Sequence, residues 1–178
     1  MQIPTIETAR LTLRGFVPDD VDRLAAILGD PEVMRYMPGG KPSSREKSEA
    51  TLQSIIHHWD QYGFGWWAVV CNADAKLIGW CGITYLDELA ETEVAYLLDK
   101  PYWGRGFTTK AARASLKYGF EQHNLDRIIA LAHIENGASR RVMEKIGMAY
   151  EKEIHLWGLD LAQYGIARDA AYTPREEN

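Results

Sequence analysis

A glycine-rich turn between an apolar strand and a helix is the part of this chain that most constrains its fold. Residues 96–118 read YLLDKPYWGRGFTTKAARASLKY, and Gly104 and Gly106 stand on either side of Arg105. Apolar side chains then recur at helical spacing, at Phe107, Ala111, Ala114 and Tyr118. The first turn of a helix carries unpaired N–H groups and a partial positive charge, and glycines let an anion approach them closely. The segment therefore predicts a binding site for a phosphorylated ligand.

The spacing of this turn excludes two common phosphate-binding loops. A Walker A loop needs glycine, four residues and then Gly-Lys-Ser/Thr, which the stretch from Gly104 to Lys110 does not supply. The dinucleotide fingerprint needs a third glycine where this chain has Thr109. A helix that begins with two glycines only for packing remains an alternative.

The turn closely resembles the acyl-coenzyme A loop of the GNAT N-acetyltransferases. In that family a strand ends in a loop of the form Gln/Arg-x-x-Gly-x-Gly/Ala, whose amides hold the coenzyme pyrophosphate. Residues 103–108, Trp-Gly-Arg-Gly-Phe-Thr, occupy the corresponding positions, with Trp103 and Thr108 as departures. Trp-Gly-x-Gly followed by a small residue is similar to the variant of the ribosomal-protein N-acetyltransferase-like branch.

A second segment, at 134–148, resembles the N-x-x-S…E-K-x-G-F/M stretch of the same family. Asn136 is a candidate helix N-cap and Gly147 a helix stop, with an apolar stripe at Ala138, Val142 and Ile146. Taken alone, Asn136 could serve only as a cap and Ser139 could simply face solvent. Residues 10–14 and 30–37 also resemble the opening of that branch. Two segments in the correct order and spacing favour the family over coincidence.

The periodicity predicts one α/β domain over 1–178, built around a mixed sheet. The expected order is β-α-α-β-β-β-α-β-α-β-β. It has strands near 11–14, 66–71, 76–86, 92–98 and 127–133, a helix at 21–28, a helix capped by Ser43 and Glu46, helices after Gly106 and Asn136, and two final strands. The resemblance implies the GNAT fold, with helices on both faces of the sheet and splayed strands 4 and 5.

The resemblance also implies a coenzyme site in the gap between the strands at 93–99 and 127–133. The pantetheine arm would pair with backbone of the first strand, and the amides of the glycine turn would hold the pyrophosphate. Asn136 would contact the pantetheine arm and Arg141 the nucleotide end, while Arg105 and Lys110 could add charge. The implied acetyl-CoA-binding residues are Leu97, Leu98, Asp99, Gly104, Arg105, Gly106, Phe107, Thr108, Thr109, Asn136 and Arg141.

The implied reaction is direct attack of a neutral amine on the acetyl-CoA thioester in a ternary complex. Ser139 is the candidate group for the developing thiolate, and Glu93 the first candidate to accept the proton of the amine. Other candidate proton acceptors are Asp87, Glu88 and His155. The acceptor would be a protein N-terminus, a small amine or an antibiotic. A non-catalytic coenzyme-binding module on the same fold is the competing hypothesis.

Charge, hydropathy and cysteine content limit which ligands, partners and cell compartments we expect for this protein. A net charge of −5 argues against broad nucleic-acid binding and favours cationic acceptors. No apolar run is long enough to span a bilayer and no signal-peptide pattern is present, so we expect a cytoplasmic protein without a membrane partner. Cys71 and Cys81 lack metal spacing, so we expect reduced, buried thiols and no metal. The resemblance leaves a homodimer as an open alternative, because dimers are common in that family.

The acceptor pocket is predicted only in outline. Aromatic or flexible apolar residues fall in segments that form the acceptor side in the family: Tyr36, Met37, Trp66, Trp67, Tyr85 and Trp157. Because such side chains mostly pack in cores, we expect a minority of them to contact substrate.

Overall fold

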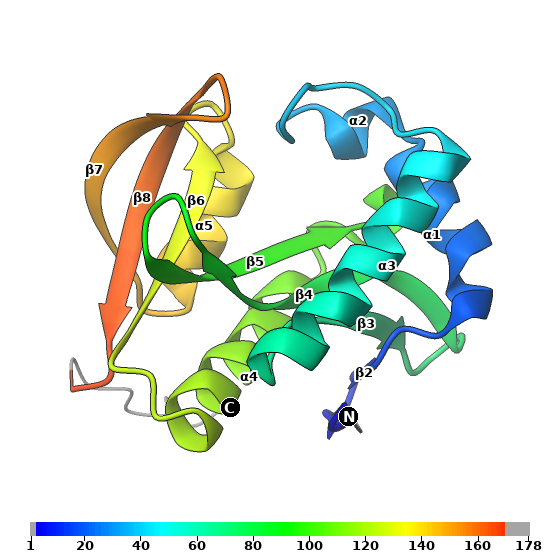
Figure 1. Cartoon of the computed structure of the whole chain (residues 1–178), viewed down its shortest axis with the longest axis horizontal. Coiled ribbons are helices and arrows are strands. Elements are labelled where there is room, and N and C mark those ends of the chain that lie inside the picture. Colours follow the sequence, from blue (N-terminus) through cyan, green and yellow to red (C-terminus); the bar gives the residue numbers. More distant parts are fainter. Residues whose placement is uncertain (1–2, 170–178) are drawn as a thin grey trace.

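The computed structural model describes residues 3–169, which form an eight-stranded sheet with helices packed against it (Figure 1). The strand order across the sheet is β1-β2-β3-β4-β5-β6-β8-β7. In chain order the strands are β1 Ile6–Glu7, β2 Leu11–Arg14, β3 Trp66–Cys71, β4 Lys76–Leu86, β5 Glu91–Leu98, β6 Arg127–His133, β7 Ala149–Leu156 and β8 Leu159–Ala167. All neighbouring pairs are antiparallel except β5 and β6, which are parallel. The predicted mixed sheet is confirmed.

Helices cover both faces of this sheet. They are α1 Val21–Leu28, α2 Pro31–Met34, α3 Arg45–Tyr62, α4 Phe107–Gln122 and α5 Gly137–Lys145, with short 3-10 turns at Pro18–Asp20 and Lys100–Tyr102. In Figure 1, α3 crosses in front of the sheet, while α4 and α5 lie behind it. The core between these layers is apolar and includes the fully buried side chains of Trp59, Trp67, Leu116 and Ile128.

β5 and β6 separate almost as soon as they meet. Glu93 opposite Ile129 is the one register pair between them, whereas β4 and β5 share eight pairs and β6 and β8 share seven. Beyond this pair the two strands diverge, which Figure 1 shows as the opening between the green and yellow parts of the sheet. The predicted splay is confirmed, and a cavity lies in the gap that it leaves in the sheet.

Three local details differ from the sequence-based expectation. The N-cap of α3 is Ser44, whose Oγ accepts from the Lys47 N–H, and not Ser43, whose own N–H donates to the Leu28 carbonyl. The short strand β1 and the one-turn helix α2 were not expected. α2 nevertheless carries a clear start signal, because Asp30 caps it and Pro31 follows.

As predicted, Cys71 and Cys81 are free and buried.

Arg127, at the start of β6, links this strand to both β5 and β7. Its guanidinium donates to Glu91 on β5 at 3.2 Å and to both carboxylate oxygens of Glu151 on β7, at 2.7 and 2.6 Å. We expect Arg127→Met to lower the free energy of unfolding by about 1 kcal/mol at pH 7. Arg127 lowers the pKa of Glu151, so this contribution should disappear as the pH falls below the ordinary glutamate range. Denaturant unfolding of both proteins at pH 7 and pH 3 measures the difference.

Candidate active site

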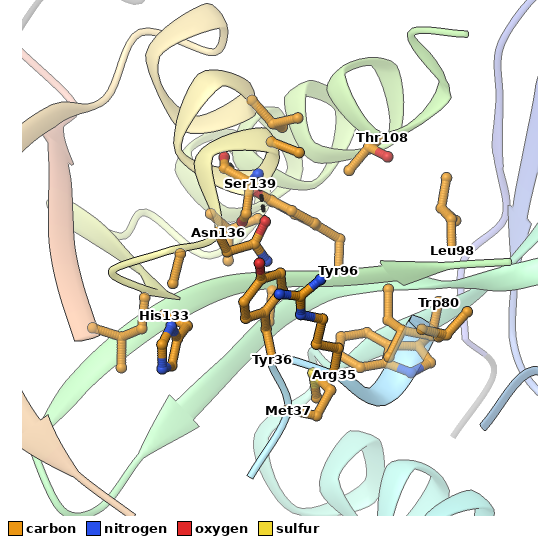
Figure 2. A pocket seen from close by; sticks show the side chains of 18 of the residues that line it. Arg35, Tyr36, Met37, Trp80, Tyr96, Leu98, Thr108, His133, Asn136 and Ser139 are labelled. Carbon is orange, nitrogen blue, oxygen red and sulfur yellow. Dashed lines mark hydrogen bonds between the residues drawn. The ribbon is translucent and has the colours of Figure 1, made fainter. Parts of the chain in front are cut away.

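A cavity of about 1130 Å³ occupies the gap between β5 and β6. Its walls come from β5, the turn into α4, the start of α5, the end of β6 and the segment at 32–38 (Figure 2). Ten of the thirteen predicted site residues line it: Glu93, Leu97, Leu98, Gly104, Gly106, Thr108, Thr109, Asn136, Ser139 and Arg141. The other three, Asp99, Arg105 and Phe107, do not. The splay therefore brings both predicted motifs to one cavity.

The turn into α4 offers an open set of backbone N–H groups. Gly104 and Gly106 have φ of +70° and +77°, and a Cβ built on either would meet no atom within 4 Å. Trp103 donates its N–H to Lys100 and Lys110 donates to Gly106; among the described residues, no hydrogen-bond acceptor is found for the N–H groups between these two. Gly106 has no side chain that could cap the helix. Unpaired donors beside an open space fit an anion such as a diphosphate.

The side chains of Arg105 and Phe107 are turned away from this open space. The Arg105 guanidinium lies over the Phe107 ring at 4.9 Å and over the Tyr102 ring at 5.6 Å. The Phe107 ring is buried in the core. Both residues can therefore contribute backbone N–H groups, but the expected added charge of Arg105 is not directed into the cavity.

Fewer backbone groups of β5 face the cleft than the resemblance implied. The Asp99 N–H donates to the Ile78 carbonyl on β4 at 2.7 Å, and the Asp99 side chain pairs with Arg23. Because backbone groups alternate in direction along a strand, those of Leu97 face β4 as well, and those of Leu98 face the cleft. The Leu98 carbonyl accepts from the Trp103 indole at 2.7 Å. The predicted backbone contacts of Leu97 and Asp99 with pantetheine are therefore corrected, because the Asp99 N–H and the backbone groups of Leu97 face β4.

Ser139 and Asn136 meet at the start of α5. The Asn136 side chain caps the helix by accepting from the Ser139 N–H at 3.1 Å, which confirms the predicted cap. The Ser139 Oγ lies 3.0 Å from the Tyr96 hydroxyl, which also donates to the Ser139 carbonyl at 3.1 Å. Burial raises the pKa of Tyr96, so its hydroxyl stays protonated. Tyr96 links β5 to α5 across the cleft (Figure 2). Sequence reasoning missed this residue, because nothing in the pattern of β5 distinguishes it from its neighbours.

Glu93 lies where β5 and β6 part. Its Oε1 accepts from the Leu131 N–H on β6 at 3.2 Å, and the side chain lines the cavity while only 7% of the residue is exposed. Burial raises the pKa of Glu93 to about 8, against the opposing effect of the Leu131 hydrogen bond. A carboxyl group with a pKa near neutrality inside a cleft is suited to proton transfer.

The alternative proton acceptors lie outside the cavity. The Glu88 carboxylate accepts from the Trp157 indole at 3.0 Å, and His155 is exposed and contacts Asp160 at 2.8 Å. Neither they nor Asp87 line the cavity. Glu93 is the one of the four candidates that does.

Four of the six predicted aromatic or flexible residues line the cavity: Tyr36, Met37, Trp66 and Trp157. Trp67 is instead buried in the core and donates to the Pro4 carbonyl, and Tyr85 packs on Tyr62. Trp80 was not expected; its ring stacks on Trp66 at 3.9 Å and lines the cavity.

Residues 3–169 hold no group of three or more His, Cys, Asp or Glu side chains that could bind a metal ion. Over the same residues no helix combines the length and the apolar character needed to cross a membrane.

The splayed sheet, the open N–H groups at α4 and the cavity between them fit the site of a coenzyme A-dependent acyltransferase. The sequence profile of the acetyltransferase (GNAT) domain matches residues 10–149, and the chain belongs to this family. Bacillus subtilis YkkB is 33% identical over 165 residues, covering 88% of this chain and 92% of YkkB.

Solved structures show the same fold. A GNAT-family acetyltransferase from Bacillus anthracis superposes with a TM-score of 0.80 at 28% identity, covering 92% of this chain and 98% of that one. RimL, a ribosomal L7/L12 alpha-N-protein acetyltransferase in complex with coenzyme A, superposes with a TM-score of 0.79 at 18% identity, covering 94% of this chain and all of RimL.

Proposed function

We propose that this protein transfers the acetyl group of acetyl-CoA to a primary amine by direct attack in a ternary complex. The observation that carries the proposal is the continuous cavity that joins the open N–H groups of residues 104–109 to Glu93 and Ser139. The RimL likeness makes a protein N-terminus the first acceptor to test, and a small amine or antibiotic the second.

Different residues of the cleft bind different parts of acetyl-CoA. Acetyl-CoA supplies an acetyl group activated as a thioester. The N–H groups at the head of α4 hold the diphosphate, and Arg141 binds near the nucleotide end. The backbone of Leu98 and the side chain of Asn136 bind the pantetheine arm. Because the family profile covers 10–149 and β8 continues the same sheet to Ala167, we also propose that the chain is a single domain.

Glu93 accepts the proton of the attacking amine. Deprotonating a lysine at pH 7 costs about 4.6 kcal/mol, whereas an α-amino group costs about 1 kcal/mol. An N-terminal amine therefore depends less on Glu93 than a lysine or polyamine does. The carboxylate form of Glu93 becomes common only as the pH rises through about 8.

The Ser139 hydroxyl stabilises the negative charge that develops on the leaving sulfur, and the Tyr96 hydroxyl is its hydrogen-bond partner. We expect Ser139→Ala to lower kcat about 10- to 100-fold with less effect on coenzyme affinity. Tyr96→Phe should lower kcat less, because it removes only the partner that orients the Ser139 hydroxyl. Steady-state kinetics and calorimetric coenzyme binding measure both effects. An unchanged kcat in Ser139→Ala removes Ser139 from the mechanism.

The activity itself is tested with acetyl-CoA and a panel of N-terminal peptides, polyamines and aminoglycosides, with products identified by mass spectrometry. Acetylated product that depends on Glu93 supports the proposal. Tight coenzyme binding without any acetylated product would favour a non-catalytic binding module.

A further inference from the structure

Arg35 places a positive charge in the cavity wall formed by residues 32–38, the wall that the family resemblance assigns to the acceptor. It follows α2 directly, and Figure 2 shows its side chain directed into the cavity among the labelled side chains. Its guanidinium lies over the Tyr36 ring, with 5.1 Å between Cζ and the ring centroid. Arg35 and Tyr36 both line the cavity.

The segment that carries Arg35 reaches across the cleft. The Tyr36 ring contacts His133 at the end of β6, with 5.4 Å between ring centroids. Met37 and Pro38 continue the same wall. This contact holds the segment over the opening between β5 and β6, so the Arg35 side chain faces the cleft.

Within residues 3–169, Arg35 forms no ion pair with a carboxylate. Glu32, the acid in the same wall, is paired with Lys100 at 2.6 Å. The other cations that line the cavity, Arg141 and Lys145, come from α5. α5 adjoins α4, where the Arg113 side chain donates to the Lys145 carbonyl, so these two charges lie on the coenzyme side.

A molecule that places its amine at Glu93 would therefore lie in the same cavity as the Arg35 guanidinium. We infer that the preferred acceptor is a primary amine that also carries an anionic group, a carboxylate or a phosphate, which the Arg35 guanidinium binds. A planar guanidinium matches both groups with two parallel hydrogen bonds. This inference rests on the proposed function. It also reverses the preference for cationic acceptors that the net charge of the whole chain suggests, because Arg35 is a cation in the wall that would face the acceptor.

The test compares N-terminal peptides whose amines are alike and whose second residues differ in charge. The pairs are Ala-Glu-amide with Ala-Gln-amide and Ala-phosphoserine-amide with Ala-Ser-amide, and Ala-Lys-amide is the cationic probe. We expect kcat/KM of wild type to be about tenfold or more higher for an anionic peptide than for its neutral partner. The pair with the larger ratio distinguishes carboxylate from phosphate.

Arg35→Gln should bring this ratio close to one, and Arg35→Lys should retain part of it. Lys41→Gln removes a positive charge from the next loop, at a residue that does not line the cavity, and should leave the ratio unchanged. Equal rates for both members of each pair in wild type, preference for Ala-Lys-amide, or an unchanged ratio in Arg35→Gln overturns the inference. So does a loss of coenzyme affinity in Arg35→Gln that accounts for the whole effect.

Failure of the proposed function gives a different result. If no peptide is acetylated, the same peptides are titrated into the coenzyme A-loaded protein. An anionic peptide should still bind about tenfold more weakly to Arg35→Gln than to wild type, and equal binding overturns the inference.

Discussion

Replacing Gly106 by leucine should weaken coenzyme A binding at least about 100-fold while the protein remains folded. The Cβ of residue 106 would enter the open space in front of the unpaired N–H groups, where the diphosphate is proposed to lie. A hydrogen bond to a charged group contributes about 1.5–3 kcal/mol, so the loss of two such bonds is enough for this effect. Isothermal titration calorimetry with coenzyme A measures it without any acceptor.

Backbone strain has to be separated from the loss of the binding space. Gly106 has a φ of +77°, so any other residue there costs about 1–2 kcal/mol of stability. Gly158 is a matched control, because its φ is +74°, its Cβ would also meet open space, and it lies in the turn between β7 and β8. Gly158→Leu should lower Tm by a few degrees, as Gly106→Leu does, and keep coenzyme affinity. Normal coenzyme binding in Gly106→Leu refutes the assignment of the loop.

The helices and strands were predictable because the buried stripes follow the periods of 3.6 and 2. On α3, the buried residues Leu52, Ile55 and Trp59 are three and four positions apart. On α4, Phe107 and Ala111 of the expected stripe are buried, while Ala114 and Tyr118 are half-buried and pack against the core. Short elements such as β1 and α2 escaped prediction because two to four residues contain too few positions to show a period.

The proposed coenzyme half of the site was predictable because it lies in two short segments, each of which has a recognisable pattern in the sequence. The two glycines, the start of α4 and the cap at Asn136 are local signals that need no tertiary structure. Asp99 shows the limit of this reasoning, since its N–H is taken by the neighbouring strand β4. Which backbone groups of a strand face a cleft depends on register, and residue types do not reveal register.

The residues around the reacting groups could not be predicted in the same way because they come from distant segments. Tyr96, Trp80 and Arg35 come from β5, β4 and the turn after α2. Each has an ordinary local role: a strand aromatic, a core tryptophan and a surface arginine. Only the divergence of β5 and β6, and the contact of Tyr36 with His133, bring them to one cavity.

Glu93→Gln should lower kcat for a lysine-type or polyamine acceptor about 100-fold or more. The substitution removes the proton acceptor but preserves the shape of the side chain, and the amide oxygen can still accept from the Leu131 N–H. Coenzyme affinity should therefore be unchanged. The loss should be smaller for an α-amino acceptor, whose deprotonation costs less. Asp87→Asn is the matched control, because Asp87 is an exposed carboxylate outside the cavity and its loss should not change kcat.

The pH dependence separates Glu93 from the acceptor amine. An acceptor such as an aminooxy compound, whose nitrogen is unprotonated throughout the range, removes the titration of the amine from the profile. With that acceptor, wild-type kcat/KM should rise through an apparent pKa of about 8, the value to which burial raises Glu93. The profile of Glu93→Gln should be flat. A wild-type profile that is equally flat would remove Glu93 from proton transfer.

Stability provides the check that lost activity is not lost structure. Burial raises the pKa of Glu93 from 4.5 to about 8, so between these values the folded protein keeps a proton that the unfolded chain releases. The unfolding free energy of wild type should therefore decrease as the pH rises through this window. Glutamine resembles the protonated carboxyl and has no such titration. Glu93→Gln should consequently be at least as stable as wild type at pH 8 and above, so a low kcat there reflects the missing carboxylate. Lower stability of the variant at pH 9 in denaturant titrations would show that the carboxylate holds the fold and would undo its assignment as a base.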